Sequence, residues 1–454
     1  YNPEGNDYTL FLPDNDAIDR YIQNSNQFNS LDELLNDRGF AGIFSRYHVI
    51  NQSYEANEFP FGAFSEPTLS NDFLAVSFVI EEDSAYYKIN NQAPVILTDI
   101  ETTNGYVHII SEALIPVTTT SYDWLQLNDG FSIFKSAVDA TGFKDIIDIN
   151  IKDEELKLQP ISMLIEHDSI FNKNEIYSFD DLASVISPDD NDYTNVINPL
   201  YNFVGYHVLS GNLYLDDFEG VSTNYSTMSD IPVNINGTGI DLKINRGKTV
   251  FDTIISGTDT TLIDFIGFNY DNSNIITQSG AIHFINRIMK QVSPSRATRT
   301  YQFHEELYIN ELKQEIGSFI IEDHSDLNRI TWDEPDLLFV QMAEASGTAW
   351  SDDYLQISGD FEMTYIIPKI VQGKYTVYLG AESFNRNNAL VEVFIDGKKI
   401  GGLVDLSFGG TAGNPFARIE LGTIDFIKYS EHIVEIKALI PGSFLWDYIQ
   451  FEPY

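Results

Sequence analysis

The chain has 454 residues, 43% of them hydrophobic, and its 68 acidic and 26 basic side chains give a formal net charge of −42. This length predicts about three domains with packed cores, and the evenly spread negative charge excludes nucleic acid and anionic membrane surfaces as partners. Because the sequence has no cysteine, disulfides, thiol catalysis, iron–sulfur clusters and cysteine-ligated zinc are excluded as well.

The first predicted domain occupies residues 1–118. "TLFLPDNDAI" (Thr9–Ile18) has the pattern of a strand that leads into a turn and a helix start. "SLDELLNDRGFAGIFSRYHVI" begins with Ser30 as a helix cap and continues with apolar residues at helical spacing. "FLAVSFVIEE" and "YYKINN" predict strands, and Asn104-Gly105 predicts a tight turn before one more apolar strand. We therefore expect a mixed α and β domain.

The second predicted domain, residues 119–292, repeats three stretches of the first in the same order, which indicates an internal duplication. The first match aligns Asp168 with Asp16. The matched stretches are "TLFLPDNDAI" with "ISMLIEHDSI" (161–170), "FSRYHVI" (44–50) with "FVGYHVL" (203–209), and "NGYVHIISEALIPV" (104–117) with "SGAIHFINRIMKQV" (279–292). Only the second copy opens with an amphipathic helix pattern, at Phe131–Ile147. We therefore expect the opening helices of the first copy to be missing from this chain.

The duplication places four of the eight histidines at equivalent positions. They are accompanied by two tyrosines, and the full set is Tyr47, His48, His108, Tyr206, His207 and His283. Two metal ligands per domain are one interpretation, but no further histidine or cysteine recurs to complete a ligand set. Each histidine lies in an apolar run, where a neutral imidazole can donate one N–H and accept at its other nitrogen. We therefore predict a structural role for these residues and no metal site.

After Val292 the pattern changes. Ser293–Thr300 is rich in proline, serine and arginine and is predicted as a linker. Asp396-Gly397 predicts a hairpin turn between two strands. Residues 301–454 otherwise show short strands with no intervening helix, which predicts an all-β sandwich or jelly roll. The clearest strand patterns are "KYTVYLGAES", "ALVEVFIDGKKIGG", "ARIELGTIDF", "EHIVEIKAL" and "DYIQFEP".

Motifs of common enzymes are missing from the sequence. There is no G-x-S-x-G elbow, P-loop or Rossmann glycine fingerprint. "HEELY", from His304, has Tyr308 where a zinc protease needs a second histidine. The acidic clusters at Ser187–Asn195 and Tyr214–Gly220 do not fit a calcium loop. We therefore predict that the protein is not an enzyme and uses no cofactor.

The three repeated stretches resemble the fasciclin domain, whose pattern is "T-x-F-A-P-T-D-x-A-F", then Tyr-His, then "N-G-x-x-H-x-I-D-x-x-L-x-P". The matching residues of the first copy are Thr9, Phe11, Pro13, Asp16, Ala17, Tyr47, His48, Asn104, Gly105, His108, Ile110, Leu114 and Pro116. The second copy keeps Asp168, Tyr206, His207, Gly280, His283 and Ile285. The resemblance implies two tandem α+β domains, a cell-surface location and an adhesive role. It also links the Tyr-His stretches to adhesion, although their apolar flanks indicate burial.

The C-terminal region is similar to jelly-roll carbohydrate-binding modules, through "GKYTVYLGAES", "VFIDGKKIGG" and "GSFLWDYIQFEP". Such modules often place an asparagine shortly before the last aspartate, whereas this chain has Leu445 and Trp446 before Asp447. Loop aromatics and nearby polar groups are our candidates for ligand contacts: Trp350, Asp352, Tyr354, Phe384, Asn385, Asn387 and Trp446. In the alternative interpretation, Trp350 and Trp446 close the ends of the core.

We therefore predict a non-enzymatic, exported adhesion or binding protein on the surface of a bacterium, with a glycan or matrix ligand. The alternative is a scaffold or accessory lipoprotein subunit of an outer-membrane complex, for example a nutrient transporter, with envelope proteins as partners. A membrane anchor is not visible in this chain.

Overall fold

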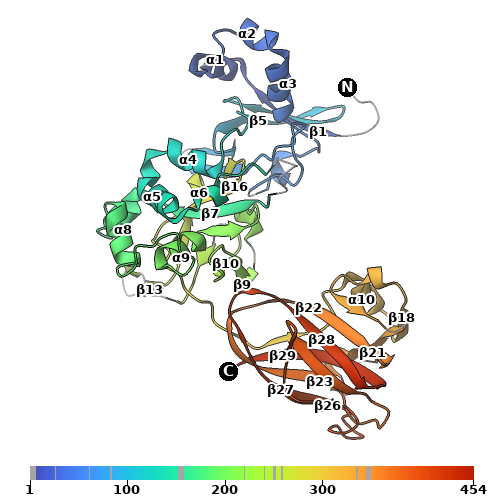
Figure 1. The fold of residues 1–454 in the computed structure, drawn as a ribbon. Coiled ribbons are helices and arrows are strands. Elements are labelled where there is room, and N and C mark those ends of the chain that lie inside the picture. The colour runs from blue at the N-terminus through green and yellow to red at the C-terminus, as the bar shows by residue number, and fades with distance from the viewer. Residues whose placement is uncertain are drawn as a thin grey trace. The chain divides into compact units, whose positions relative to one another are not determined.

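The computed structural model describes residues 7–25, 27–60, 62–81, 84–151, 158–218, 220–239, 241–248, 252–256, 259–333, 336–343 and 349–454. The chain divides into two compact units, Tyr1–Pro294 and Ser295–Tyr454 (Figure 1). The first unit contains both copies of the predicted duplication, and the second contains the predicted sandwich.

The first copy is built on a six-stranded sheet in the order β2-β1-β6-β5-β4-β3. Only β1 and β6 run parallel, and the other pairs are antiparallel. Helices α1 to α3 group together beside this sheet (Figure 1). The elements are β1 (Tyr8–Pro13), α1 (Asn15–Asn24), α2 (Leu31–Asn36), α3 (Arg38–Tyr47), β2 (Val49–Ile50), β3 (Val76–Glu81), β4 (Ser84–Ile89), β5 (Ala93–Thr102) and β6 (Gly105–Ile110).

The second copy has the same central pairing, with β7 parallel to β16 and antiparallel to β8. Its sheet runs β8-β7-β16-β14-β11-β10-β9, and β15 also pairs with β16. The strands are β7 (Ile161–Glu166), β8 (Val208–Ser210), β9 (Gly220–Tyr225), β10 (Val233–Gly237), β11 (Lys243–Ile244), β14 (Ile266–Asn269), β15 (Ile275–Thr277) and β16 (Gly280–Ile285), with a separate hairpin of β12 (Asp252–Ser256) and β13 (Asp259–Ile263).

Helices α4 to α9 belong to the second copy and pack on its core. The helix predicted at Phe131–Ile147 forms as two pieces, because Gly142 ends the first in the left-handed region, at φ 75°. The helices are α4 (Ser121–Leu127), α5 (Ser132–Thr141), α6 (Lys144–Ile147), α7 (Asp168–Lys173), α8 (Phe179–Ile186) and α9 (Pro199–Tyr206).

Repeated hydrogen bonds fix the alignment of the two copies. Thr9 Oγ1 accepts from the N–H of Tyr54 at 2.8 Å, and Ser162 Oγ accepts from the N–H of Leu213 at 2.7 Å. Each hydroxyl also donates to the carbonyl two residues before that N–H. Thr9 therefore corresponds to Ser162, and the predicted alignment of these two stretches is wrong by one residue.

The corrected alignment changes two pairings. Asp16 corresponds to Ser169 rather than to Asp168, and Pro13 corresponds to Glu166. All six residues of β7 are buried, so this strand has no alternation of apolar and polar residues by which its sequence could set the register.

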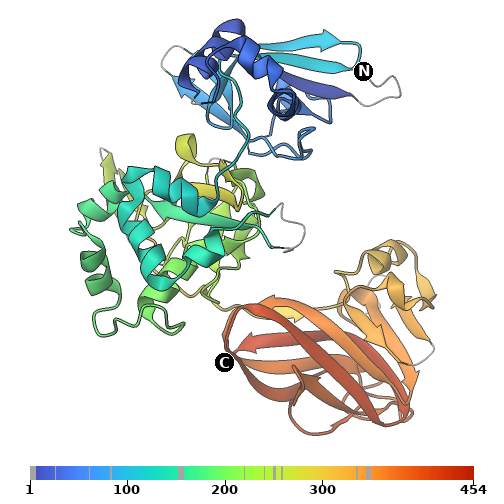
Figure 2. The same ribbon diagram turned by 45° about the horizontal axis from the view of Figure 1, so that its top comes forward.

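The second unit is a β-sandwich of two sheets (Figure 2). The first sheet contains β18 (Gly317–Ile321), β20 (Leu337–Gln341), β21 (Asp353–Gly359), β29 (Gly442–Pro453), β23 (Gly373–Glu382) and β27 (Phe416–Phe426), with β17 (Arg299–Tyr301) on β29. The second contains β19 (Ile330–Trp332), β22 (Glu362–Ile370), β28 (Ser430–Ile440), β24 (Leu390–Ile395), β25 (Lys398–Lys399) and β26 (Val404–Asp405). One short α-helix, α10 (Leu307–Leu312), and two 3-10 turns, His324–Asp326 and Trp350–Asp352, accompany the strands among the described residues of this unit.

The predicted classes, α+β followed by an all-β sandwich, agree with these folds. The division between the two compact units, at Pro294 and Ser295, falls inside the predicted linker Ser293–Thr300. The last two residues of that segment, Arg299 and Thr300, already belong to β17 and pair with β29. Residues 286–298, between β16 and β17, form neither helix nor strand.

Candidate binding sites

His48 and His207 each follow a helix and bond back to it. Nδ1 of His48 lies 2.8 Å from the carbonyl of Phe44, and Nδ1 of His207 lies 2.7 Å from that of Phe203. Because a carbonyl only accepts, both Nδ1 atoms carry a proton. Nε2 of His48 then accepts from the N–H of Leu114 at 2.9 Å. Both rings are buried, so they join backbone segments rather than face a ligand.

The second copy inserts a carboxylate into this arrangement. Glu166 Oε1 accepts from the N–H of Met289, the counterpart of Leu114, at 2.7 Å and lies 3.0 Å from Nε2 of His207. Glu166 and His207 are both fully buried, and the second carboxylate oxygen, Oε2, has no hydrogen-bond partner among the described residues. The pair is therefore an acid and a base that share one hydrogen bond inside the core.

His108 and His283 complete the duplicated set. In each ring Nδ1 accepts a backbone N–H and Nε2 donates to a backbone carbonyl, 2.8–3.3 Å away in all four bonds. Burial lowers the pKa of both histidines, and for His283 to about 4. The partners are Asp99 and Tyr54 for His108, and Asn274 and Leu213 for His283.

The two tyrosines of the Tyr-His stretches also have matching partners. Tyr47 Oη accepts from Asn90 at 3.1 Å, and Tyr206 Oη accepts from Asn245 at 3.0 Å. Both asparagines adopt positive φ, 52° and 51°, a conformation that asparagine tolerates better than most residues. Our sequence analysis missed them, although "KIN" ends at both positions and could have revealed the repeat. The Tyr-His stretches are thus buried parts of the scaffold.

In the sandwich, Trp446 must be removed from the ligand candidates. It is fully buried, and its ring packs at 5.8 Å from Phe303 and 5.2 Å from Tyr365. A ring with no exposed face cannot stack on a ligand, and the alternative interpretation, closure of the core, holds for this residue.

Trp350 and Tyr354 lie on the outer face of the first sheet. Trp350 is 51% exposed, and its ring centroid lies 5.4 Å from that of Tyr448. Tyr354 meets Phe416 at the same distance. Leu355, the next residue of β21, belongs to the core, so Tyr354 points to the opposite, outer face.

Tyr378 and Arg418 extend this face. Arg418 stacks on the ring of Tyr378, 3.4 Å from its centroid, and donates to Glu452 at 2.7 Å. Gly380 lets the ring of Tyr448 lie across β23, since a Cβ there would come within 2.4 Å of that ring. We call this group the outer aromatic surface, which consists of Trp350, Tyr354, Tyr378, Phe416, Arg418 and Tyr448; Tyr448 is buried, at 8% exposure, and the other five are at least partly exposed. Sequence analysis missed its last four members, although strand alternation places Tyr378 outward.

The other predicted contacts lie on two loops. Phe384, Asn385 and Asn387 are exposed between β23 and β24, where Asn385 Oδ1 accepts from the N–H of Asn387 at 3.1 Å. Asp352 precedes β21 with φ 57°. Among the described residues, no hydrogen bond or ring contact joins the β23–β24 loop to Trp350, so the structure does not bring all the candidates together.

Beneath Trp350 lies a buried acid. Asp447 Oδ2 accepts from the N–H of Trp350 at 2.9 Å, and Gln302 donates to Oδ1 at 3.3 Å. Burial raises the pKa of Asp447 to about 7, and the nearby Asp353 adds to the increase. This acid positions the backbone that carries the Trp350 ring.

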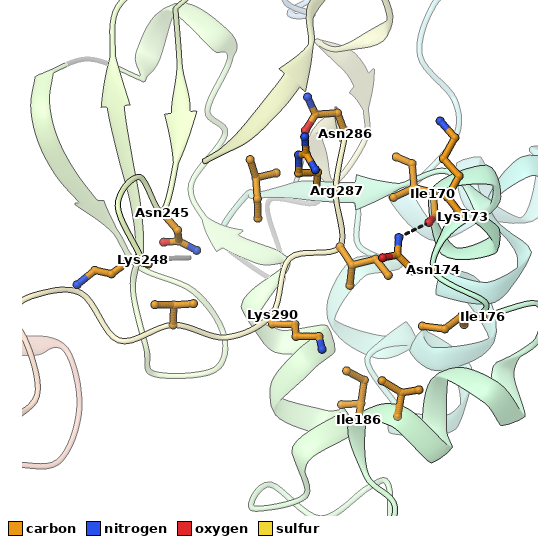
Figure 3. A pocket seen from close by; sticks show the side chains of 14 residues that line it. Ile170, Lys173, Asn174, Ile176, Ile186, Asn245, Lys248, Asn286, Arg287 and Lys290 are labelled. Carbon is orange, nitrogen blue, oxygen red and sulfur yellow. Dashed lines mark hydrogen bonds between the residues drawn. The ribbon is translucent and has the colours of Figure 1, made fainter. Parts of the chain in front are cut away.

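The first unit contains a pocket of about 690 Å³ between α7, α8, β14, the loop after β11 and the segment that follows β16 (Figure 3). In Figure 3, Lys290 lies in the middle, with Ile176 and Ile186 on one side and Asn245 and Lys248 on the other. The fourteen lining residues include four cations and seven aliphatic residues but no acid. We call it the cationic pocket; its cations are Lys173, Lys248, Arg287 and Lys290.

Neither metal clusters nor membrane-spanning helices are found in the part of the chain that the structure describes. No group of three or more histidine, aspartate or glutamate side chains there could hold a metal ion. None of the described helices is long and apolar enough to cross a membrane.

Comparison with known proteins identifies the first copy. Residues 2–116 match the family model of the fasciclin domain. Stabilin-2 of Rattus norvegicus is 28% identical over 108 residues, which are 24% of this chain and only 7% of that protein. A fasciclin-domain pair of the insect cell adhesion molecule Fasciclin I covers 63% of this chain and 89% of its own, with 18% identity and a TM-score of 0.29. A family 35 carbohydrate-binding module from Clostridium thermocellum covers 30% and 99%, with 10% identity and a TM-score of 0.22.

Proposed function

We propose that this chain is a non-catalytic binding protein of the cell surface, and that its sandwich binds glycans at the outer aromatic surface. One observation carries the glycan proposal: Trp350 exposes half of its surface on the outside of a sheet, beside the ring of Tyr448, which in turn lies near the charged Arg418. An aromatic face covers the C–H bonds of a sugar ring, while neighbouring polar groups bond to its hydroxyls.

The architecture of the first unit supports a tandem pair of adhesive domains. Residues 2–116 match the fasciclin domain, and we assign residues 119–292 to a second, divergent one. The support is the shared hydrogen bonding of Thr9 and Ser162, of the four histidines and of Asn90 and Asn245. The match of residues 2–116 supports the proposed cell-surface location, and a location at the bacterial outer membrane stays a prediction.

The glycan proposal is tested by binding of the full chain to a glycan array and by the variant Trp350→Ala. We expect the variant to lose glycan binding with little change in its melting temperature, because half of the side chain is already exposed. Truncating a buried tryptophan would instead cost about 3–5 kcal/mol. Phe408→Ala is the matched control, since Phe408 is also exposed, at 70%, in the same unit.

Two outcomes would count against glycan binding. The wild type could bind no glycan, or Trp350→Ala could bind as well as the wild type. Recovery of the chain in a stoichiometric membrane complex would favour the scaffold alternative. Mass spectrometry of that complex would then identify the partner proteins.

A further inference from the structure

We propose that the cationic pocket binds an amphiphilic anion, meaning an aliphatic chain that carries a carboxylate or phosphate head. The chain has 68 acids and only 26 basic residues, yet the described residues that line this pocket include four basic residues and no acid. Such a local reversal of sign focuses a positive potential that attracts anions in an otherwise acidic protein.

In the first copy, the positions equivalent to two of the pocket cations form an ion pair. There Arg20, the sixth residue after the N-cap of α1, forms an ion pair with Glu112 at 2.8 Å. The sixth residue after the N-cap of α7 is Lys173, and the counterpart of Glu112, four residues after the aligned histidine, is Arg287. The second copy thus has two cations lining one pocket at the positions where the first copy has a partly exposed ion pair. An anion bound in the pocket would lie near both cations, and this proximity favours its binding.

At a third position the second copy also has a positive charge that the first copy lacks. Ile115 of the first copy, 50% exposed, corresponds to Lys290. Within the described residues, no carboxylate lies within ion-pair distance of Lys173 or Lys290. Both ammonium groups can therefore turn to a ligand head without breaking an existing ion pair.

The aliphatic part of the lining favours a ligand with an aliphatic chain. The pocket contains aliphatic side chains and no aromatic ring, so it lacks the stacking platform that sugars favour. Its volume of about 690 Å³ is that of a small-molecule site. The aliphatic residues are Ile170, Ile176, Val185, Ile186, Ile266, Ile288 and Val292.

Calorimetric titration of the full chain with dodecanoate, below its micelle concentration, tests the proposal. We expect one site per chain, comparable binding of dodecyl phosphate, at least tenfold weaker binding of dodecanol, and affinity that falls with added salt. Acetate and inorganic phosphate should not bind at millimolar concentration. Equal affinity for dodecanol would overturn the role of charge, and saturation by inorganic phosphate alone would overturn the role of the aliphatic chain.

The variant Arg287→Glu restores the charges of the first copy, because the introduced carboxylate would face Lys173 as Glu112 faces Arg20. We expect at least a tenfold loss of dodecanoate affinity in a variant that still folds, as circular dichroism would show. Lys428→Glu makes a similar charge reversal at an exposed residue outside the pocket and should bind like the wild type. Lys290→Met, which removes one charge at an exposed position, should weaken binding severalfold. Full affinity in either folded pocket variant would overturn the proposal.

Discussion

At the residue scale, the duplicated histidines stabilise the fold by joining backbone groups that would otherwise be buried without partners. Their structural role could be predicted from sequence because each lies in an apolar run. The difference between the copies could not, since it depends on Glu166, which lies far from His207 along the chain. In the first copy Leu114 bonds directly to His48, whereas in the second a buried carboxylate stands between the two groups.

The variant His207→Ala should lower the free energy of unfolding by roughly 1–3 kcal/mol, because it leaves Glu166 and the carbonyl of Phe203 buried with fewer partners. His48→Ala is the matched control and should cost less, since it leaves no carboxylate behind. Urea unfolding of both variants measures the difference. An equal cost for the two would show that the Glu166 contact contributes nothing.

At the scale of the elements, the alternation of apolar and polar residues and the residues typical of turns predicted strands and hairpins where only one face of a strand is buried. Asp396-Gly397 does connect two paired strands, since Ile395 pairs with Lys398. Alternation failed in β7, which is buried on both faces, and it could not show that Arg299 adds a strand to a partner about 150 residues away. Only two of the six residues of the outer aromatic surface were predicted, because strand order brings Tyr448 beside Trp350 and no local sequence pattern reveals that pairing.

The segment between the two units allows a prediction about where a protease cuts the chain. Trypsin should cut after Arg296, which is exposed and lies outside regular structure, but not after Arg299, whose backbone pairs with Phe451. Arg296→Ala should therefore remove the early cut, while Arg299→Ala should leave it, as judged by mass spectrometry of the fragments. Early cleavage after Arg299 would mean that β17 opens readily.

At the scale of the whole molecule, buried ionisable groups give the two units opposite responses to pH. His283 in the first unit has a pKa lowered to about 4. In the folded protein it therefore stays neutral at pH values where the unfolded chain, with a histidine pKa near 6.5, binds a proton. Asp447 in the second unit has a pKa raised to about 7, so its folded form holds a proton that the unfolded chain releases near pH 4. Acidification therefore costs stability at His283 and adds stability at Asp447.

Lowering the pH from about 7.5 to about 4.5 should thus destabilise the first unit by about 2 kcal/mol through His283 and stabilise the second by about 3 kcal/mol through Asp447. Calorimetry of the full chain should resolve two transitions that move apart or cross as the pH falls. Other groups titrate over the same range, so the comparison that decides is with His283→Asn and Asp447→Asn, in which each shift should shrink for one transition only. Asparagine keeps a donor and an acceptor but cannot ionise in this range. If both variants kept the pH dependence of the wild type, ionisation of these two buried groups could not be its cause.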